Sequence, residues 1–175
     1  VMYFAGAKLW DGAEFWIDPE LVQGFGLSNT QGAAGYPNGA SAKVGASVPY
    51  ARIQRAFIRQ TIDLGGKFAK INADQNQFAG AQSADRLVIW VGKYAVSDVF
   101  DINKYATNPR KDFLNYSFID TGTFDFAGDA WGYTYGASAE WYQGDWTLRG
   151  GSFDLSASPG STNLDPDFGQ FQWVG

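Results

Sequence analysis

Apolar and polar residues alternate with a period of two along several separate stretches of the chain, whereas helical spacing of apolar residues is scarce. The first two stretches, residues 1–10 and 13–18, flank Asp11-Gly12, a dipeptide suited to a type I′ hairpin because both central positions need φ > 0. Period-two alternation is typical of half-buried strands, so the chain is predicted to be all-β, with about seven strands. The later strands are expected at about 51–63, 86–95, 129–141, 146–155 and at the C-terminal end.

The strand expected at 129–141 carries aromatic residues on one face and small or polar residues on the other. Trp131 and Trp141 share the aromatic face, and ten residues at ~3.3 Å each separate them by ~33 Å along the strand. A tilt of ~40° reduces this to a height of roughly 25 Å, which matches the apolar band between the aromatic girdles of an outer-membrane barrel. The pattern therefore favours an antiparallel transmembrane β-barrel, with small and polar side chains toward the lumen, over a sandwich with one wet face.

The lengths of the connections favour the same architecture, since outer-membrane barrels alternate short periplasmic turns with long extracellular loops. Asp11-Gly12 and residues 142–145 are short turns, and if strands alternate in direction both fall at one end of the sheet. The polar segment 67–85 falls at that end too and is the exception to the rule. Three long connections fall at the opposite end: 19–50, 96–128 and 156–167.

Composition excludes several classes of function. The 175 residues include no Cys and no His, so a disulfide, a zinc site of the usual kind, a thiol nucleophile and a Ser-His pair are all excluded. A net charge of -5 argues against a partner nucleic acid, which needs a basic face. No run of 18 apolar residues is long enough for a transmembrane helix. We expect a protein that is not an enzyme and that binds no cofactor and no metal.

The two ends of the sequence lead us to expect part of a longer chain. No charged and apolar leader stands at Val1, and the last residues stop within an alternating run. We expect residues 1–175 to belong to one domain, without a second domain.

Seven motifs follow one another in order along nearly the whole chain: WDGAE at 10–14, DPEL at 18–21, QGFGLSNT at 23–30, FIRQT at 57–61, ADRL at 84–87, DAWGYTYG at 129–136 and QGDWTLR at 143–149. In this order they resemble the carbohydrate-selective porins of the OprB family. The resemblance implies an outer-membrane β-barrel of about 16 strands in a Gram-negative bacterium, through which glucose and other sugars diffuse. This chain would supply roughly the first half of that barrel, with outer-membrane lipids around it and, as in many porins, a homotrimeric assembly.

Alternation along the strands also predicts which side chains face the lumen. An Arg at the lipid midplane costs roughly 2–4 kcal/mol, so Arg55 and Arg59, which share a face, should point inward. Lys8 and Trp10 share the parity of the carboxylates on the strand 13–18. Trp10 and Trp16 could equally be girdle residues that face lipid, with the carboxylates near the rim. Arg52 is expected only to reach toward the rim. The residues predicted to line the pore and bind the passing sugar are Glu14, Trp16, Asp18, Arg55, Arg59, Arg86, Glu140 and Arg149.

A sugar pore needs hydrogen-bonding groups for hydroxyls and aromatic faces for the C–H side of the ring, arranged so that the solute leaves again. We expect Arg55, Arg59, Glu14 and Trp16 to form the constriction, and arginines opposite carboxylates to suit neutral polyols better than ions of either sign.

Two other functions compete with the pore. A soluble β-sandwich carbohydrate-binding module or glycosidase would use Trp platforms and a carboxylate pair such as Glu14 and Glu140, ~5–10 Å apart in a cleft. A structural barrel filled by its own side chains would conduct nothing, but small residues such as Gly132, Gly136 and Ser138 on the predicted lumen face favour open space.

Overall fold

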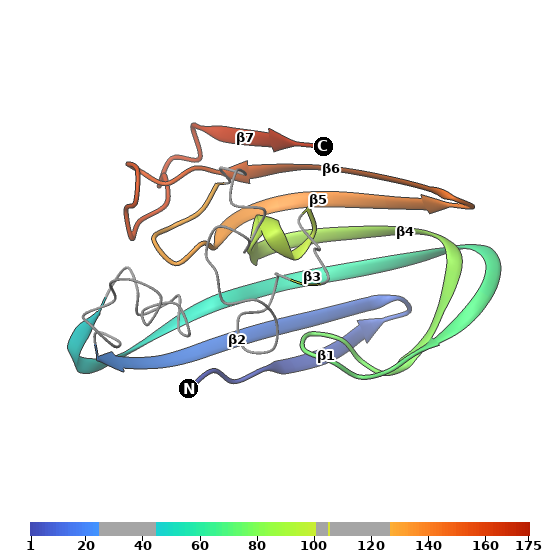
Figure 1. The fold of residues 1–175 in the computed structure, drawn as a ribbon, viewed down its shortest axis with the longest axis horizontal. Helices are drawn as coiled ribbons and strands as arrows, with labels where there is room; N and C mark the ends of the chain where they lie inside the picture. Colours follow the sequence, from blue (N-terminus) through green and yellow to red (C-terminus); the bar gives the residue numbers. More distant parts are fainter. Residues whose placement is uncertain (25–44, 101–104, 106–126) are drawn as a thin grey trace.

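The described residues of the computed structural model are 1–24, 45–100, 105 and 127–175, and their strands form one antiparallel sheet (Figure 1). Each strand pairs with its neighbours in the sequence, so the seven strands follow the order β1 to β7 across the sheet. This arrangement confirms the prediction of an all-β antiparallel fold. The strands are β1 (Ala5–Trp10), β2 (Ala13–Gly24), β3 (Ala46–Ile71), β4 (Gly80–Tyr94), β5 (Thr134–Gln143), β6 (Trp146–Asp154) and β7 (Phe171–Val174).

The connections between these strands are only partly described. Of the long segments expected at 19–50 and 96–128, residues 25–44, 101–104 and 106–126 lie outside the described residues. A short 3-10 helix, η3 (Val96–Asp98), follows β4 directly. Within the described ranges no helix is both long enough and apolar enough to cross a membrane.

The first hairpin turns at the dipeptide that the sequence predicts, but the turn is not of type I′, because Gly12 has a positive φ and Asp11 does not. β1 ends at Trp10 and β2 begins at Ala13, so Asp11 and Gly12 form the turn. Gly12 has a φ of 71°, and a Cβ at this position would overlap the carbonyl oxygen of Thr61. This close approach of the two backbones lets the Thr61 amide donate a hydrogen bond of 2.7 Å to the Gly12 carbonyl. Only glycine meets both requirements.

The middle strands are longer than the sequence pattern indicates. The strand expected at about 51–63 extends as β3 to Ile71, with register shifts on both sides of Gly65. β4 likewise begins at Gly80 rather than near Arg86. The polar segment 67–85 is therefore mostly paired strand, and the connection itself is residues 72–79, which we call the strap.

The prediction that Trp131 and Trp141 share a face of one strand is wrong. β5 begins only at Thr134, because the Asp129 carboxylate accepts hydrogen bonds from the backbone amides of Trp131 (2.9 Å) and Tyr133 (3.2 Å) and holds the chain in a turn. The Trp131 ring lies 4.0 Å from the guanidinium of Arg52. Trp131 is thus on the opposite face of the sheet from Trp141, and the girdle spacing inferred from this pair does not exist.

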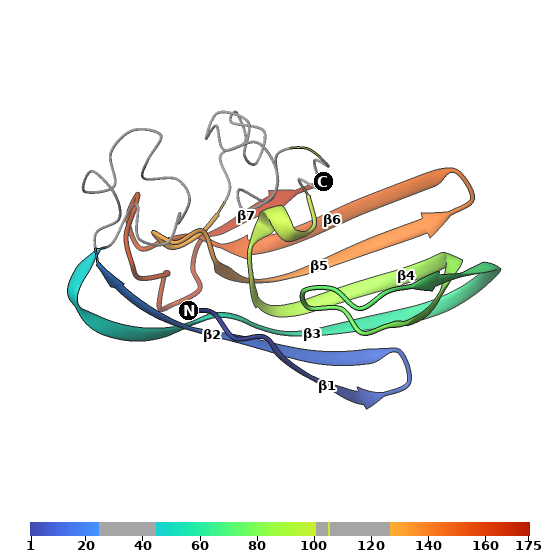
Figure 2. The same ribbon diagram turned by 60° about the horizontal axis from the view of Figure 1, so that its bottom comes forward.

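The sheet has one polar and one apolar face. The apolar face carries large hydrophobic side chains that remain exposed, from β2 through to β7, and exposed apolar surface of this extent marks an interaction surface. Its exposed members include Leu21, Ile53, Ile58, Ile62, Leu64, Val91, Tyr135, Trp141, Leu148, Phe171 and Trp173. The opposite face, which we call the polar face, is the side over which η3 and the strap lie (Figure 2).

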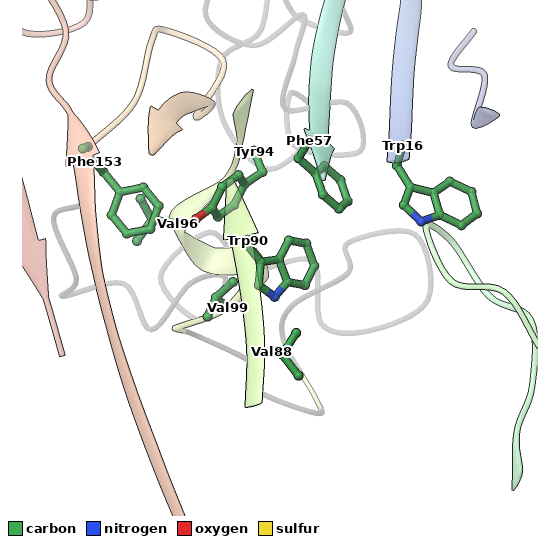
Figure 3. Close-up of a cluster of buried hydrophobic side chains, with 9 residues drawn as sticks. Trp16, Phe57, Val88, Trp90, Tyr94, Val96, Val99 and Phe153 are labelled. Atoms are coloured by element: carbon green, nitrogen blue, oxygen red, sulfur yellow. The ribbon is translucent and has the colours of Figure 1, made fainter. Parts of the chain in front are cut away.

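A row of buried aromatic rings crosses the polar face from β2 to β6 (Figure 3). The rings of Phe57 and Trp90 stack at 4.8 Å, and Tyr94 meets Phe153 edge-on at 5.5 Å. Val96 and Val99 of the segment after β4 are buried in the same cluster. This packing anchors η3 against the polar face rather than beyond the end of the sheet.

Candidate functional site

Cross-strand pairing aligns opposite charges along the polar face. In the register of β2 with β3, Glu14 lies opposite Arg59 and Asp18 lies opposite Arg55. A bulge between Asp18 and Pro19 shifts the pairing by one residue, so that Glu20 lies opposite Arg52. The resulting ion pairs are Glu14–Arg59 at 2.6 Å, Asp18–Arg55 at 3.4 Å and Glu20–Arg52 at 2.9 Å.

Arg55 ties the sheet to η3. Its Nε and Nη2 donate hydrogen bonds of 2.7 Å to the two carboxylate oxygens of Asp98, a bidentate arrangement that fixes both groups. Its guanidinium also lies 4.9 Å from the ring of Tyr133, which precedes β5. Burial raises the pKa of the Tyr133 phenol, so the ring stays neutral beside the cation. Asp18, which is fully buried, lies on the other side of Arg55.

Glu140 is the centre of a second network on β4, β5 and β6. Its carboxylate accepts hydrogen bonds from the indole of Trp90 (3.0 Å), the hydroxyl of Tyr142 (2.6 Å) and Nε of Arg149 (2.9 Å). The guanidinium of Arg59 lies 5.0 Å from the ring of Trp90. The two networks are therefore continuous, and they cover the polar face from β2 to β6.

Arginines and aromatic rings are stacked throughout this face. In the described part of the chain all five arginines lie over a ring, which restricts each guanidinium plane. The pairs are Arg52 on Trp131 at 4.0 Å, Arg55 on Tyr133 at 4.9 Å, Arg59 on Trp90 at 5.0 Å, and Arg86 and Arg149 on Tyr142 at 3.7 and 5.6 Å.

A cavity of ≈ 640 Å³ lies between the strap and the sheet. That volume falls within the ~300–1,000 Å³ of sites that enclose small ligands. Carboxylates, guanidinium groups and aromatic rings line it together, a mixture that can hydrogen-bond hydroxyls and cover the C–H face of a sugar ring. The sheet contributes Glu14, Arg59, Arg86, Trp90, Glu140 and Tyr142, and the strap contributes Gln77, Phe78 and Ala79.

The strand registers place all eight sequence-predicted site residues on the polar face. Four of them, Glu14, Arg59, Arg86 and Glu140, also line the cavity. The other four, Trp16, Asp18, Arg55 and Arg149, lie beside it in the same networks. Their role in lining a passage remains a prediction.

At the edge of this set, the expectation for Arg52 is wrong, and the register excludes one of the two alternatives for Trp10. Arg52 does not merely reach toward a rim, because it is mostly buried and paired with Glu20. Trp10 departs from the alternation of Lys8, since the register shifts between them and Trp10 pairs with Ala13. Its indole donates a 2.6 Å hydrogen bond to Gln60.

Sequence reasoning missed several residues that complete the site. Asn76, Phe78 and Asp98 come from connections, where side chains follow no alternation that could assign them to a face. Glu20 carried a usable signal, because it continues the parity of Asp18 through Pro19, but the strand was expected to end before it. Among the described residues no group of three or more carboxylates could hold a metal ion.

An antiparallel sheet with an exposed apolar face and a polar face opposite it has the pattern of a membrane β-barrel wall. A comparison with protein families matches residues 5–173, nearly the whole chain, to "Carbohydrate-selective porin, OprB family". The chain therefore belongs to the OprB family of carbohydrate-selective porins, a family of outer-membrane β-barrels, and the resemblance in its sequence is confirmed. Neither the curated proteins nor the solved structures that were searched give a match.

Proposed function

We propose that this chain forms part of the wall of an outer-membrane pore through which glucose and other neutral sugars diffuse passively, with the polar face lining the passage. The observation that carries the proposal is the continuous network of paired charges and aromatic rings on that face, opposite an exposed apolar face. Residues 1–175 would all belong to one barrel domain in a Gram-negative outer membrane. As in many porins, we propose a homotrimer.

The pairing of charges supports neutral solutes rather than ions. Four of the five described arginines lie within 4 Å of a carboxylate, so their fields largely cancel at a distance. The remaining donors and acceptors can still bind hydroxyl groups at close range. Many such contacts, each of them weak, let a sugar enter and leave. We propose that all eight predicted residues line the passage, and that Glu14, Trp16, Arg55 and Arg59 form its constriction.

The soluble alternative is not favoured, because the described residues form one sheet and not the two packed sheets of a sandwich. The carboxylates of Glu14 and Glu140, proposed for a glycosidase, are both held by arginine side chains.

Liposome swelling with the complete polypeptide tests the proposed function directly. Vesicles that contain the protein should swell in glucose and other neutral monosaccharides, and protein-free vesicles should not. Absence of swelling, or release of hydrolysed sugar, would overturn the proposal.

An Ile58→Arg variant tests whether the apolar face contacts lipid. Ile58 lies near the middle of β3 on that face, opposite Phe15 of β2. An Arg at a bilayer midplane is destabilising by about 2–4 kcal/mol, so we expect the free energy of unfolding in lipid vesicles to fall by that amount. Urea titration measures it, with Ile58→Leu as the apolar control. Equal stability of the two variants would mean that this face does not lie against lipid.

An Arg59→Ala variant tests the constriction. Arg59 lines the cavity and holds Glu14, so its loss removes a charged donor and leaves a carboxylate unpaired. A hydrogen bond to a charged group contributes about 1.5–3 kcal/mol. We therefore expect glucose to inhibit the single-channel ion current about tenfold more weakly, and cations to permeate more readily.

Arg59→Lys is the matched control for this substitution. It keeps the positive charge beside Glu14 but loses the planar group over Trp90. It should retain the ion selectivity of the wild type and lose only part of the glucose effect. If conductance and glucose inhibition are unchanged in Arg59→Ala, Arg59 is not part of the constriction.

A further inference from the structure

The strap folds back over the polar face instead of extending beyond the end of the sheet (Figure 2). Two backbone hydrogen bonds of 3.1 Å between Asp74 and Gln77 close its tip. The strap belongs to the end of the sheet that carries the short turns, whereas η3 reaches the same face from the end with the long connections (Figure 1). The polar face is thus covered from both ends.

Asn76 attaches the strap to two neighbouring strands. Its side-chain amide donates a 2.8 Å hydrogen bond to Asp18 of β2, and its backbone carbonyl accepts one of 2.9 Å from Arg59 of β3. The residue is buried, and its φ of 54° lies in the left-handed region, where asparagine is enriched among residues other than glycine. Side chain and backbone conformation both suit this position.

Phe78 packs the strap against β1 and β2. Its ring lies 4.6 Å from the ring of Trp16 and 5.7 Å from the ammonium group of Lys8. Both Phe78 and its neighbour Gln77 line the cavity, opposite Glu14 and Arg59 on the sheet. The strap therefore forms one wall of the cavity, and the position of that wall depends on Asn76 and Phe78.

We propose that the strap sets the upper size limit for sugars in this pore, and that Asn76 is the positioning residue that holds it. This inference rests on the proposed function as a sugar pore. With the strap attached, its wall opposite Glu14 and Arg59 narrows the space over the polar face, so that small neutral sugars pass more readily than long ones. With the strap released, the wall opposite Glu14 and Arg59 is lost and longer oligosaccharides pass.

Two substitutions at Asn76 test the contribution of its side chain separately from that of its backbone. Asn76→Gly keeps access to positive φ and loses the hydrogen bond to Asp18. Asn76→Asp places a second carboxylate beside Asp18 and repels it. In liposome swelling with the full polypeptide, both variants should admit maltotetraose several-fold faster than the wild type, with a smaller change for glucose. Gln75→Ala, at an exposed position of the same strap, should behave as the wild type.

A spin label reports the position of the strap without any transport. These 175 residues contain no Cys, so a Gln75→Cys substitution provides the single attachment site among them. The label should be more mobile in combination with Asn76→Gly than with Asn76 intact. A mobile label with unchanged oligosaccharide entry would overturn the size limit, and an immobile label would overturn the role of Asn76. Failure of the wild type to admit any sugar would instead overturn the proposed function, whatever the label shows.

Discussion

An Arg55→Ala variant is expected to lose about 3–5 kcal/mol of unfolding free energy and to conduct ions more readily than the wild type. The substitution leaves Asp18, which is fully buried, and Asp98 without their shared cation, and breaking a buried ion pair from one side has a cost of that size. It also releases η3, which Arg55 holds by its bidentate contact. Urea unfolding in lipid vesicles measures the stability, and planar-bilayer recording measures the conductance.

Charge neutralisation at Asp98 provides the matched comparison. Asp98→Asn keeps the shape of the side chain and leaves Arg55 paired with Asp18, so we expect a smaller loss of stability with a similar release of η3. Conductance that rises in neither variant would show that η3 does not narrow the passage. Wild-type stability in Arg55→Ala would contradict the burial of this pair.

A Phe153→Ala variant is expected to lose about 3–5 kcal/mol of unfolding free energy relative to the wild type. The Phe153 ring is fully buried, and it lies against Tyr94 (5.5 Å) and Phe100 (5.8 Å). A Cβ at Gly136 or at Gly151 would overlap this ring, so two backbones approach it closely and have no side chain with which to fill the space left behind. Thermal unfolding followed by heat-dependent mobility on gels measures the loss.

Two controls accompany Phe153→Ala. One keeps most of the side-chain volume at position 153, and the other removes a phenylalanine at an exposed position. Phe153→Leu should lose much less stability, because most of the ring volume remains filled. Phe171→Ala removes a phenylalanine from the exposed apolar face of β7 and should change stability only slightly. A Phe171 effect as large as that of Phe153 would contradict the assignment of the core to the polar face.

The face of each site residue could be predicted from the sequence because alternation continues along any strand without a bulge. Glu14, Trp16 and Asp18 alternate on β2, and the register carries their face onto β3 through Arg59 and Arg55. The same logic holds on the later strands. What alternation cannot anticipate is a register shift, such as the one after Asp18 that brings Arg52 and Glu20 together.

The parts of the site that come from connections could not be predicted for a different physical reason. Asn76, Asp98 and Trp131 reach the polar face through hydrogen bonds and packing between residues far apart in the chain. Trp131 was also misassigned for a local reason: its spacing from Trp141 fitted a membrane girdle, but the Asp129 carboxylate holds the backbone of Trp131 in a turn through a hydrogen bond, and β5 begins only at Thr134. The alternation of apolar and polar residues gives no sign of that hydrogen bond.

The contacts of Asn76 and Asp98 also indicate the order in which the strands and their connections fold. The contact of Asn76 with Asp18 spans 58 residues, and that of Arg55 with Asp98 spans 43. Closing loops of this length has an entropic cost that the intervening strand pairs must already have met. The strap and η3 can therefore dock only once β2, β3 and β4 have found their registers. We therefore expect strand pairing first in this order, and docking of the strap and η3 against the polar face last.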